Sequence, residues 1–144
     1  MRTAAGIIFL LLAGVLQTPA QLSLRAASAE PVPGWARMEL GNQTVWVSPT
    51  ASLTSADIAR AEAVSSPDAK RAVAVEFSDE GARKMRDLSA AQIDKLIALV
   101  LDGRLIWAPK VRGVMDKQAL LTGNGPEGLP EPLIQRILSS VSRR

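Results

Sequence analysis

The stretch from residue 73 to residue 109 reads VAVEFSDEGARKMRDLSAAQIDKLIALVLDGRLIWAP, and most of the expected fold follows from its pattern. Its first residues alternate, because the larger apolar side chains Val73, Val75 and Phe77 stand at every second position. A period of two places these side chains on one face, which is typical of a half-buried strand. The alternation therefore predicts a strand over residues 71–77.

The pattern after this strand predicts a helix over residues 79–95 that breaks near its middle. Ser78 stands at the N-cap position, and two acidic residues follow it beside the positive end of the helix dipole. Apolar residues then recur at helical spacing. Ser89 and Gln92 form a second capping-box pattern, from which we expect the helix to stop and restart near Ser89.

Two further strands joined by a tight turn are predicted after the helix. Residues 96–101 form a continuous apolar run of strand length, which indicates a central strand covered on both faces. Asp102-Gly103 is a strong hairpin signal, since a type I′ turn needs positive φ at both central residues. Residues 104–108 form the predicted return strand, and Pro109 ends it because proline has no N–H to donate to a strand ladder.

Four elements are expected outside this stretch. Alternation predicts a short strand over residues 44–48, and a weaker strand is expected over residues 117–122. A capping-box pattern that begins at Thr54 predicts a helix over residues 54–64. A single apolar stripe predicts a final helix over residues 129–141.

The predicted elements alternate irregularly and include a hairpin, which argues against a doubly wound parallel sheet. We expect a single small α+β domain, in which an antiparallel or mixed β-sheet packs against helices that lie mainly on one face. The predicted core consists of Val73, Val75, Phe77, Met85, Leu88, Ile93, Ile97, Leu99, Leu101, Leu133, Ile137 and Leu138.

The beginning of the chain has the pattern of a secretory signal peptide. A short positive region is followed by an apolar segment over residues 4–16, which is short for a membrane span. We predict cleavage after Ala29, where an A-x-A motif ends, and cleavage after Ala20 is the alternative. A third interpretation is a retained N-terminal anchor. The predicted organisation is a signal peptide over residues 1–29, an extended leader over 30–43 and a domain over 44–144.

Composition excludes several kinds of site and partner. Once Arg2 and Arg25 of the predicted signal peptide are set aside, 15 basic residues face 14 acidic ones. The charges are nearly balanced, and no basic run is interleaved with aromatic residues. Both observations argue against nucleic acid as a binding partner. The chain has no cysteine and no histidine, which excludes disulfides, the usual zinc and copper sites and every Cys–His or Ser–His–Asp arrangement. We expect no metal and no cofactor.

Three segments resemble a known family. VEFSDEGARKMRDLS, ALVLDGRLIWAP and LLTGNG resemble the head subdomain of the first periplasmic domain of SecD, the bacterial protein-export accessory subunit. VWVSPTASLTSADIARAEAV resembles the segment that precedes them, so the resemblance covers residues 44–141. It implies a periplasmic or secreted bacterial module that contacts unfolded polypeptide. We expect the head alone, without the transmembrane helices and intramembrane charges that the family uses for proton coupling.

The expected function is therefore binding without catalysis. The expected partner is a polypeptide or protein, with no nucleic acid and no stable membrane insertion after signal cleavage, and the oligomeric state is open. One alternative is an envelope inhibitor or immunity-type protein that binds one folded partner. Another is a small secreted enzyme, although no spacing singles out any Asp, Glu, Lys, Ser or Arg. The predicted partner contacts are Arg104, Trp107, Pro109, Lys110 and Arg112, and the competing interpretation is a solvated edge with Trp107 buried.

Overall fold

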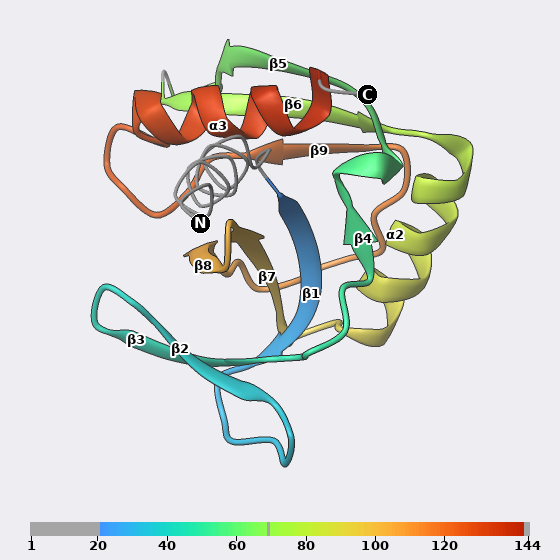
Figure 1. The fold of residues 1–144 in the computed structure, drawn as a ribbon, viewed down its shortest axis with the longest axis vertical. Helices are drawn as coiled ribbons and strands as arrows, with labels where there is room; N and C mark the ends of the chain where they lie inside the picture. The colour runs from blue at the N-terminus through green and yellow to red at the C-terminus, as the bar shows by residue number, and fades with distance from the viewer. Residues whose placement is uncertain (1–20, 69, 143–144) are drawn as a thin grey trace, which may run out of the picture.

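The computed structural model describes residues 21–68 and 70–142. In this part the chain forms a mostly β-sheet domain with two α-helices (Figure 1). In chain order its elements are β1 (Leu22–Ser28), β2 (Ala36–Leu40), β3 (Gln43–Val47), β4 (Leu53–Thr54), the 3-10 turn η1 (Ser55–Asp57), β5 (Ile58–Ser65), β6 (Arg71–Phe77), α2 (Asp79–Ala91), β7 (Leu96–Leu101), β8 (Arg104–Trp107), β9 (Gln118–Leu121) and α3 (Glu131–Ser142).

The larger sheet is antiparallel and has β1 near its centre. Its strand order is β2-β3-β1-β7-β8, and β4 also pairs with β1. Since β2 lies against β8, the sheet curls into a nearly closed, barrel-like arrangement. A small apolar cluster of Ala27, Val45, Val47, Ala98, Val100, Leu105 and Ala108 fills its inside.

The smaller sheet has the order β5-β6-β9, and its strands also pair antiparallel. Helix α3 lies across β5 and β6, while α2 packs beside η1, β4 and β6 (Figure 1). The main core lies between this layer and the outer face of the larger sheet. Its most deeply buried large side chains include Leu53, Val73, Leu99, Leu129, Ile134 and Ile137.

Strand β7 confirms the prediction of a strand covered on both faces. Ile97 and Leu99 point into the main core, whereas Ala98 and Val100 belong to the cluster inside the larger sheet. The continuous apolar run at residues 96–101 is therefore explained by two separate cores, one on each side of the strand. The observed bounds of β6 and β7 match the predicted strands.

The hairpin between β7 and β8 also has the predicted geometry. Asp102 has a φ of 53° and Gly103 a φ of 82°, so both central residues of the turn are left-handed. The strands predicted over residues 44–48, 104–108 and 117–122 and the helix over 129–141 are confirmed to within two residues at each end.

The predicted helix over residues 54–64 is wrong. The capping box at Thr54 does form, but it caps only the short turn η1, and β5 follows at once. Residues 60–65 pair with β6 in a hairpin. Helix propensity contributes only about 0.7 kcal/mol per residue or less between ordinary residues, so pairing with a neighbouring strand outweighs it here.

The predicted helix break at Ser89 is wrong as well. Helix α2 runs through Ser89 to Ala91, and Gln92 is its C-cap. The Gln92 side chain donates to the carbonyl oxygens of Ala27 and Leu96, which lie in the larger sheet. Ile93, predicted in the core, is 37% exposed because it comes after the helix end.

The chain before residue 44 also differs from the expectation. Residues 1–20 of the predicted signal peptide lie outside the described residues, but residues 22–28, which belong to the same predicted segment, form strand β1. The extended leader is wrong for residues 36–43, because β2 forms a hairpin with β3 around Gly41, whose φ is 61°. The folded domain therefore includes strands well before residue 44.

Candidate functional site

Four of the five predicted contact residues lie together. Trp107, Pro109, Lys110 and Arg112 line one depression of about 420 Å³, which we call the apolar groove. Arg104 does not line it and lies in a different pocket. The predicted site is therefore divided between two hollows rather than gathered on one surface.

The apolar groove lies between the β8–β9 connection and strand β9. Its floor is formed by core residues of β1, α2 and β7, and its wall by the connection itself and by β9. Trp107 is half-buried and packs against the main core, so part of its ring is structural and part faces the groove. The remaining lining residues are Leu24, Met85, Ile97, Leu99, Val111, Gly113, Val114, Met115, Ala119, Leu120 and Leu121.

The lining of the groove combines exposed apolar side chains with basic ones. Val114 is 57% exposed and Leu120 is 39% exposed, and both line the same hollow. Lys110 and Arg112 are exposed, and within the described residues neither side chain has an ion-pair partner. The groove thus offers an apolar surface beside positive charge.

The connection that forms the groove wall is held at two points. The N–H of Val111 donates to the Lys95 carbonyl at 2.8 Å, and the N–H of Asp94 donates to the Val111 carbonyl at 2.8 Å. Further on, the N–H of Met115 donates to Ser89 Oγ at 2.8 Å. Residues 112–114 therefore form a short exposed arch between two fixed points.

Ser89 links helix α2 to this wall. Its side chain is fully buried, and its hydroxyl donates to the Met85 carbonyl at 2.7 Å while it accepts the N–H of Met115. Sequence reasoning assigned Ser89 to a cap and missed this role, because no local pattern signals a partner 26 residues away. Val114 and Leu120 were missed too.

We expect Ser89→Ala to destabilise the domain by about 1–3 kcal/mol, because the partly buried N–H of Met115 loses its acceptor. Urea denaturation followed by circular dichroism measures this change in the free energy of unfolding. Ser139→Ala is the matched control, since the Ser139 hydroxyl only donates to the Arg136 carbonyl in its own helix. Equal stabilities of the two variants would contradict the assigned role of Ser89.

Strand β9 borders the groove and lies at an edge of its sheet. In the described part of the chain it pairs with β6 on one side, with Ala74 opposite Leu120, and the sheet order ends with it. Ala119, Leu120 and Leu121 of this strand all line the groove. An edge strand can accept a further extended segment by backbone pairing, so the groove combines apolar contacts with a template for strand addition.

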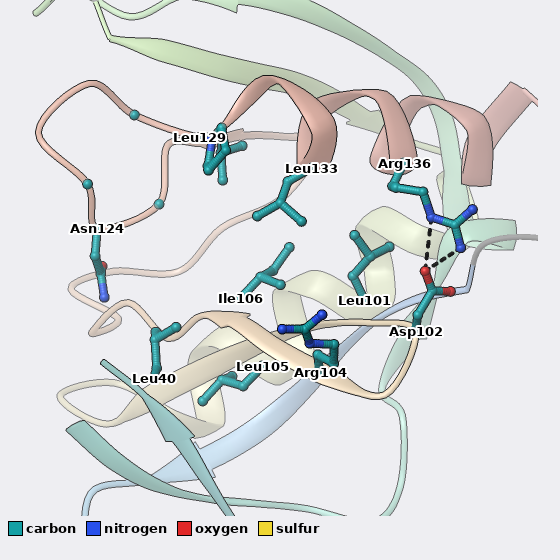
Figure 2. A pocket seen from close by; sticks show the side chains of 14 residues that line it. Leu40, Leu101, Asp102, Arg104, Leu105, Ile106, Asn124, Leu129, Leu133 and Arg136 are labelled. Carbon is teal, nitrogen blue, oxygen red and sulfur yellow. Dashed lines mark hydrogen bonds and ion pairs between the residues drawn. The ribbon is translucent and has the colours of Figure 1, made fainter. Parts of the chain in front are cut away.

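The second pocket, of about 540 Å³, contains Arg104 and lies between β8, the loop 123–130 and α3 (Figure 2). At its rim Arg136 of α3 reaches Asp102 of the β7–β8 turn, and both its Nε and Nη2 donate to Asp102 Oδ2, with Nε at 3.1 Å. Arg104 stands on β8 beside Ile106. Within the described residues Arg104 forms no ion pair.

Besides its place in the β7–β8 turn, Asp102 is an ion-pair partner of Arg136, and its carboxyl group has a lowered pKa. Partial burial acts to raise the pKa of its carboxyl group, but the hydrogen bond from Arg136, a backbone hydrogen bond from Gln21 and the Arg136 charge outweigh burial and lower that pKa. A lowered pKa in the folded state contributes stability at neutral pH that is lost as the pH falls through the folded pKa. The contribution is small because both partners are partly exposed.

Within residues 21–68 and 70–142, no group of three or more acidic side chains is arranged to hold a metal ion. In the same part of the chain, neither helix has the length and apolar character needed to cross a membrane.

Comparison with known proteins points to one family. The sequence profile described as "SecDF, P1 head subdomain" matches residues 33–128. The protein translocase subunit SecDF of Thermus thermophilus is 39% identical over 72 residues, which is 49% of this chain and 10% of that protein. The protein translocase subunit SecD of Acidaminococcus fermentans is 32% identical over 73 residues, 50% of this chain and 18% of that protein. The chain thus matches only a small part of either relative.

Solved structures agree with this result. A SecDF structure described as a membrane component that enhances protein export superimposes with a TM-score of 0.63 at 23% identity, over 98% of this chain and 69% of that one. A SecDF crystal structure in a super-membrane-facing form also gives 0.63, at 25% identity, over 97% of this chain and 21% of that one. The two-sheet arrangement described above is therefore the fold of the SecDF P1 head.

Proposed function

Because the chain belongs to the SecDF P1 head family, we propose that it is a non-enzymatic, protein-export-related module that binds extended apolar polypeptide in the apolar groove. The observation that carries the proposal is the exposure of Val114 and Leu120 around a hollow beside the edge strand β9. The relatives named as protein translocase subunits support the choice of an exported polypeptide as the partner. The signal-peptide pattern supports a periplasmic location.

The groove suits an unfolded segment better than a folded surface. An extended chain can pair its backbone with β9 while alternate side chains enter the hollow in front of Trp107. Such binding depends on backbone groups and general apolarity, so it tolerates many sequences. Lys110 and Arg112 add attraction for acidic segments and speed the encounter, an effect that weakens as salt rises.

The test is a titration of the full mature chain into a fluorescently labelled, unfolded polypeptide that contains apolar segments, followed by anisotropy. Leu120→Ser combined with Val114→Ser should raise the Kd about tenfold or more, since two large apolar contacts of roughly 1 kcal/mol or more each are lost. Thermal melts verify that the variant remains folded. An unchanged Kd would overturn the proposal that the groove is the binding surface.

A matched pair of arginine variants tests whether the partner binds only in the apolar groove or also contacts the second pocket. Arg112→Ala should weaken binding about two- to fivefold at low salt, which is the range of an exposed charge contact. Arg104→Ala, the same change at the second pocket, should leave the Kd within error. Equal losses from both variants would show that the partner contacts both hollows, contrary to this account.

A further inference from the structure

The residue just before β1 is bound closely to the β7–β8 turn. The backbone N–H of Gln21 donates to Asp102 Oδ1 at 2.9 Å, and the N–H of Asp102 donates to the Gln21 carbonyl at 2.8 Å. Arg136 occupies the other carboxylate oxygen, Oδ2 (Figure 2). The Gln21 nitrogen therefore contacts Oδ1 of the Asp102 carboxylate, the oxygen that Arg136 does not bind.

The sequence before Gln21 fits a processing site. Thr18-Pro19-Ala20 places small residues at the last and third-last positions, shortly after the apolar segment that ends at Leu16. Cleavage after Ala29, the site preferred from sequence alone, would fall beyond β1 and take a central strand out of the larger sheet.

From these two observations we propose that a signal peptidase cuts between Ala20 and Gln21, and that the released α-ammonium group of Gln21 forms an ion pair with Asp102. Hydrolysis breaks the C–N bond of this peptide link. Water supplies a hydroxyl to the Ala20 carbonyl carbon and a proton to the Gln21 nitrogen. Transfer of the acid proton then leaves a carboxylate on Ala20 and an ammonium on Gln21 at neutral pH.

The cut changes the strength of an existing contact. Before cleavage the Gln21 nitrogen is a neutral amide donor, and after cleavage it is a cation, so its hydrogen bond to Asp102 becomes charge-assisted on both sides. The Asp102 carboxylate then joins three parts of the fold: the start of β1, the β7–β8 turn and helix α3. Processing thereby stabilises the mature domain relative to its precursor.

The charges around this contact determine its pH dependence. Asp102 raises the pKa of the new α-amino group, whereas the cations Arg136 of α3, Arg104 of β8 and Arg25 of β1 lower it. Arg25 is directed elsewhere, since its guanidinium donates to the Ser48 and Pro49 carbonyls. An α-amino group has a pKa of about 7.7–8.0 when unperturbed, so the added stability is present below about pH 7.7 and is lost as the pH rises through the raised folded value.

The first test is intact-mass and N-terminal analysis of the full chain exported from a bacterial host. The expected mature N-terminus is Gln21 with a free amine. A start at Glu30, an uncut chain, or a Gln21 that has cyclised with loss of ammonia would overturn the proposal.

The second test compares the mature chain with a chain that is longer by Ala20 alone, in which the Gln21 nitrogen is again an amide. NMR titration should give the mature chain a higher α-amine pKa than the longer chain, whose α-amine should keep the usual value of about 7.7–8.0. Asp102→Asn should abolish the difference. If that variant does not fold, an N-acetylated mature chain, which has no ionisable α-amine, should lack the loss of stability that the mature chain shows as the pH rises. The same α-amine pKa in both chains would contradict the ion pair.

Discussion

Replacing Gly128 by alanine is expected to destabilise the domain severely. Gly128 has a φ of 88°, and a Cβ there would stand 2.1 Å from the carbonyl oxygen of Arg71 and 2.6 Å from its nitrogen. The left-handed backbone alone costs a side chain about 1–2 kcal/mol. The clash is with backbone atoms, which cannot rotate away as a side chain does.

The surrounding hydrogen bonds prevent an easy adjustment. Arg71 begins β6, and its N–H donates to the Glu127 carbonyl at 2.9 Å, while its carbonyl accepts the N–H of Leu129 at 2.9 Å. Leu129 is 1% exposed and anchors the start of α3 in the main core. Moving the loop far enough to admit a Cβ would break both bonds and withdraw Leu129. We therefore expect a loss above about 3 kcal/mol, a large share of a typical total of about 5–15 kcal/mol.

Two other glycines provide matched controls. Gly103 has a φ of 82°, but no atom lies within 4 Å of the position that a Cβ would take, so Gly103→Ala should cost only the backbone strain. Gly113 has neither the positive φ nor a close neighbour, so Gly113→Ala should be near neutral. Urea denaturation should show the largest loss in the free energy of unfolding for the Gly128 variant, a smaller loss for Gly103 and the smallest for Gly113. A stable Gly128→Ala variant would show that the loop before α3 does not pass this close to Arg71.

A chain that begins at Glu30 is expected not to fold, whereas a chain that begins at Gln21 should. The shorter chain lacks β1, which pairs with β7 over six residue pairs and also with β3 and β4. Leu22, Leu24 and Ala27 of this strand are all at least nine-tenths buried. Without β1 the larger sheet separates into two hairpins, and an isolated hairpin is marginally stable at best.

Circular dichroism and amide NMR of the two chains decide this prediction. We expect dispersed amide signals and a cooperative melt only from the chain that starts at Gln21. A cooperative melt at the same temperature from the chain that starts at Glu30 would contradict the central position of β1. It would also restore cleavage after Ala29 as the preferred processing site.

Much of the fold follows from local sequence, but only where the local signal and the tertiary contacts agree. Strands β6 and β7 and the turn at Asp102 were predicted because alternation, apolar runs and turn chemistry are local properties. Strand β5 was not, because the capping box at Thr54 is equally good at starting a short 3-10 turn. Strand β1 was assigned to the predicted signal peptide because its small residues resemble a cleavage region, and the partner of its Leu24 is Leu99, which is 75 residues away in sequence.

Local sequence also grouped most, but not all, of the residues that line the candidate site. Tryptophan, proline and basic residues near one hairpin indicated a contact surface, and four of the five residues do line the apolar groove. Arg104 could not be separated from them by sequence, because β7 and β8 shift register between Leu99 and Val100, and only the structure shows which residues then share a hollow. The other wall of the groove, β9, is distant in sequence from the hairpin.

The most direct measurement of the central claim is amide NMR of the mature chain during addition of an unfolded, apolar polypeptide. The account predicts that the largest shift changes fall on the arch 112–114 and on β9 (Gln118–Leu121), with the Trp107 indole signal moving at the same concentrations. Residues around Arg104 and the loop 123–130 should stay unchanged. Shift changes confined to that second pocket, or none at saturating polypeptide, would contradict the apolar groove as the binding site.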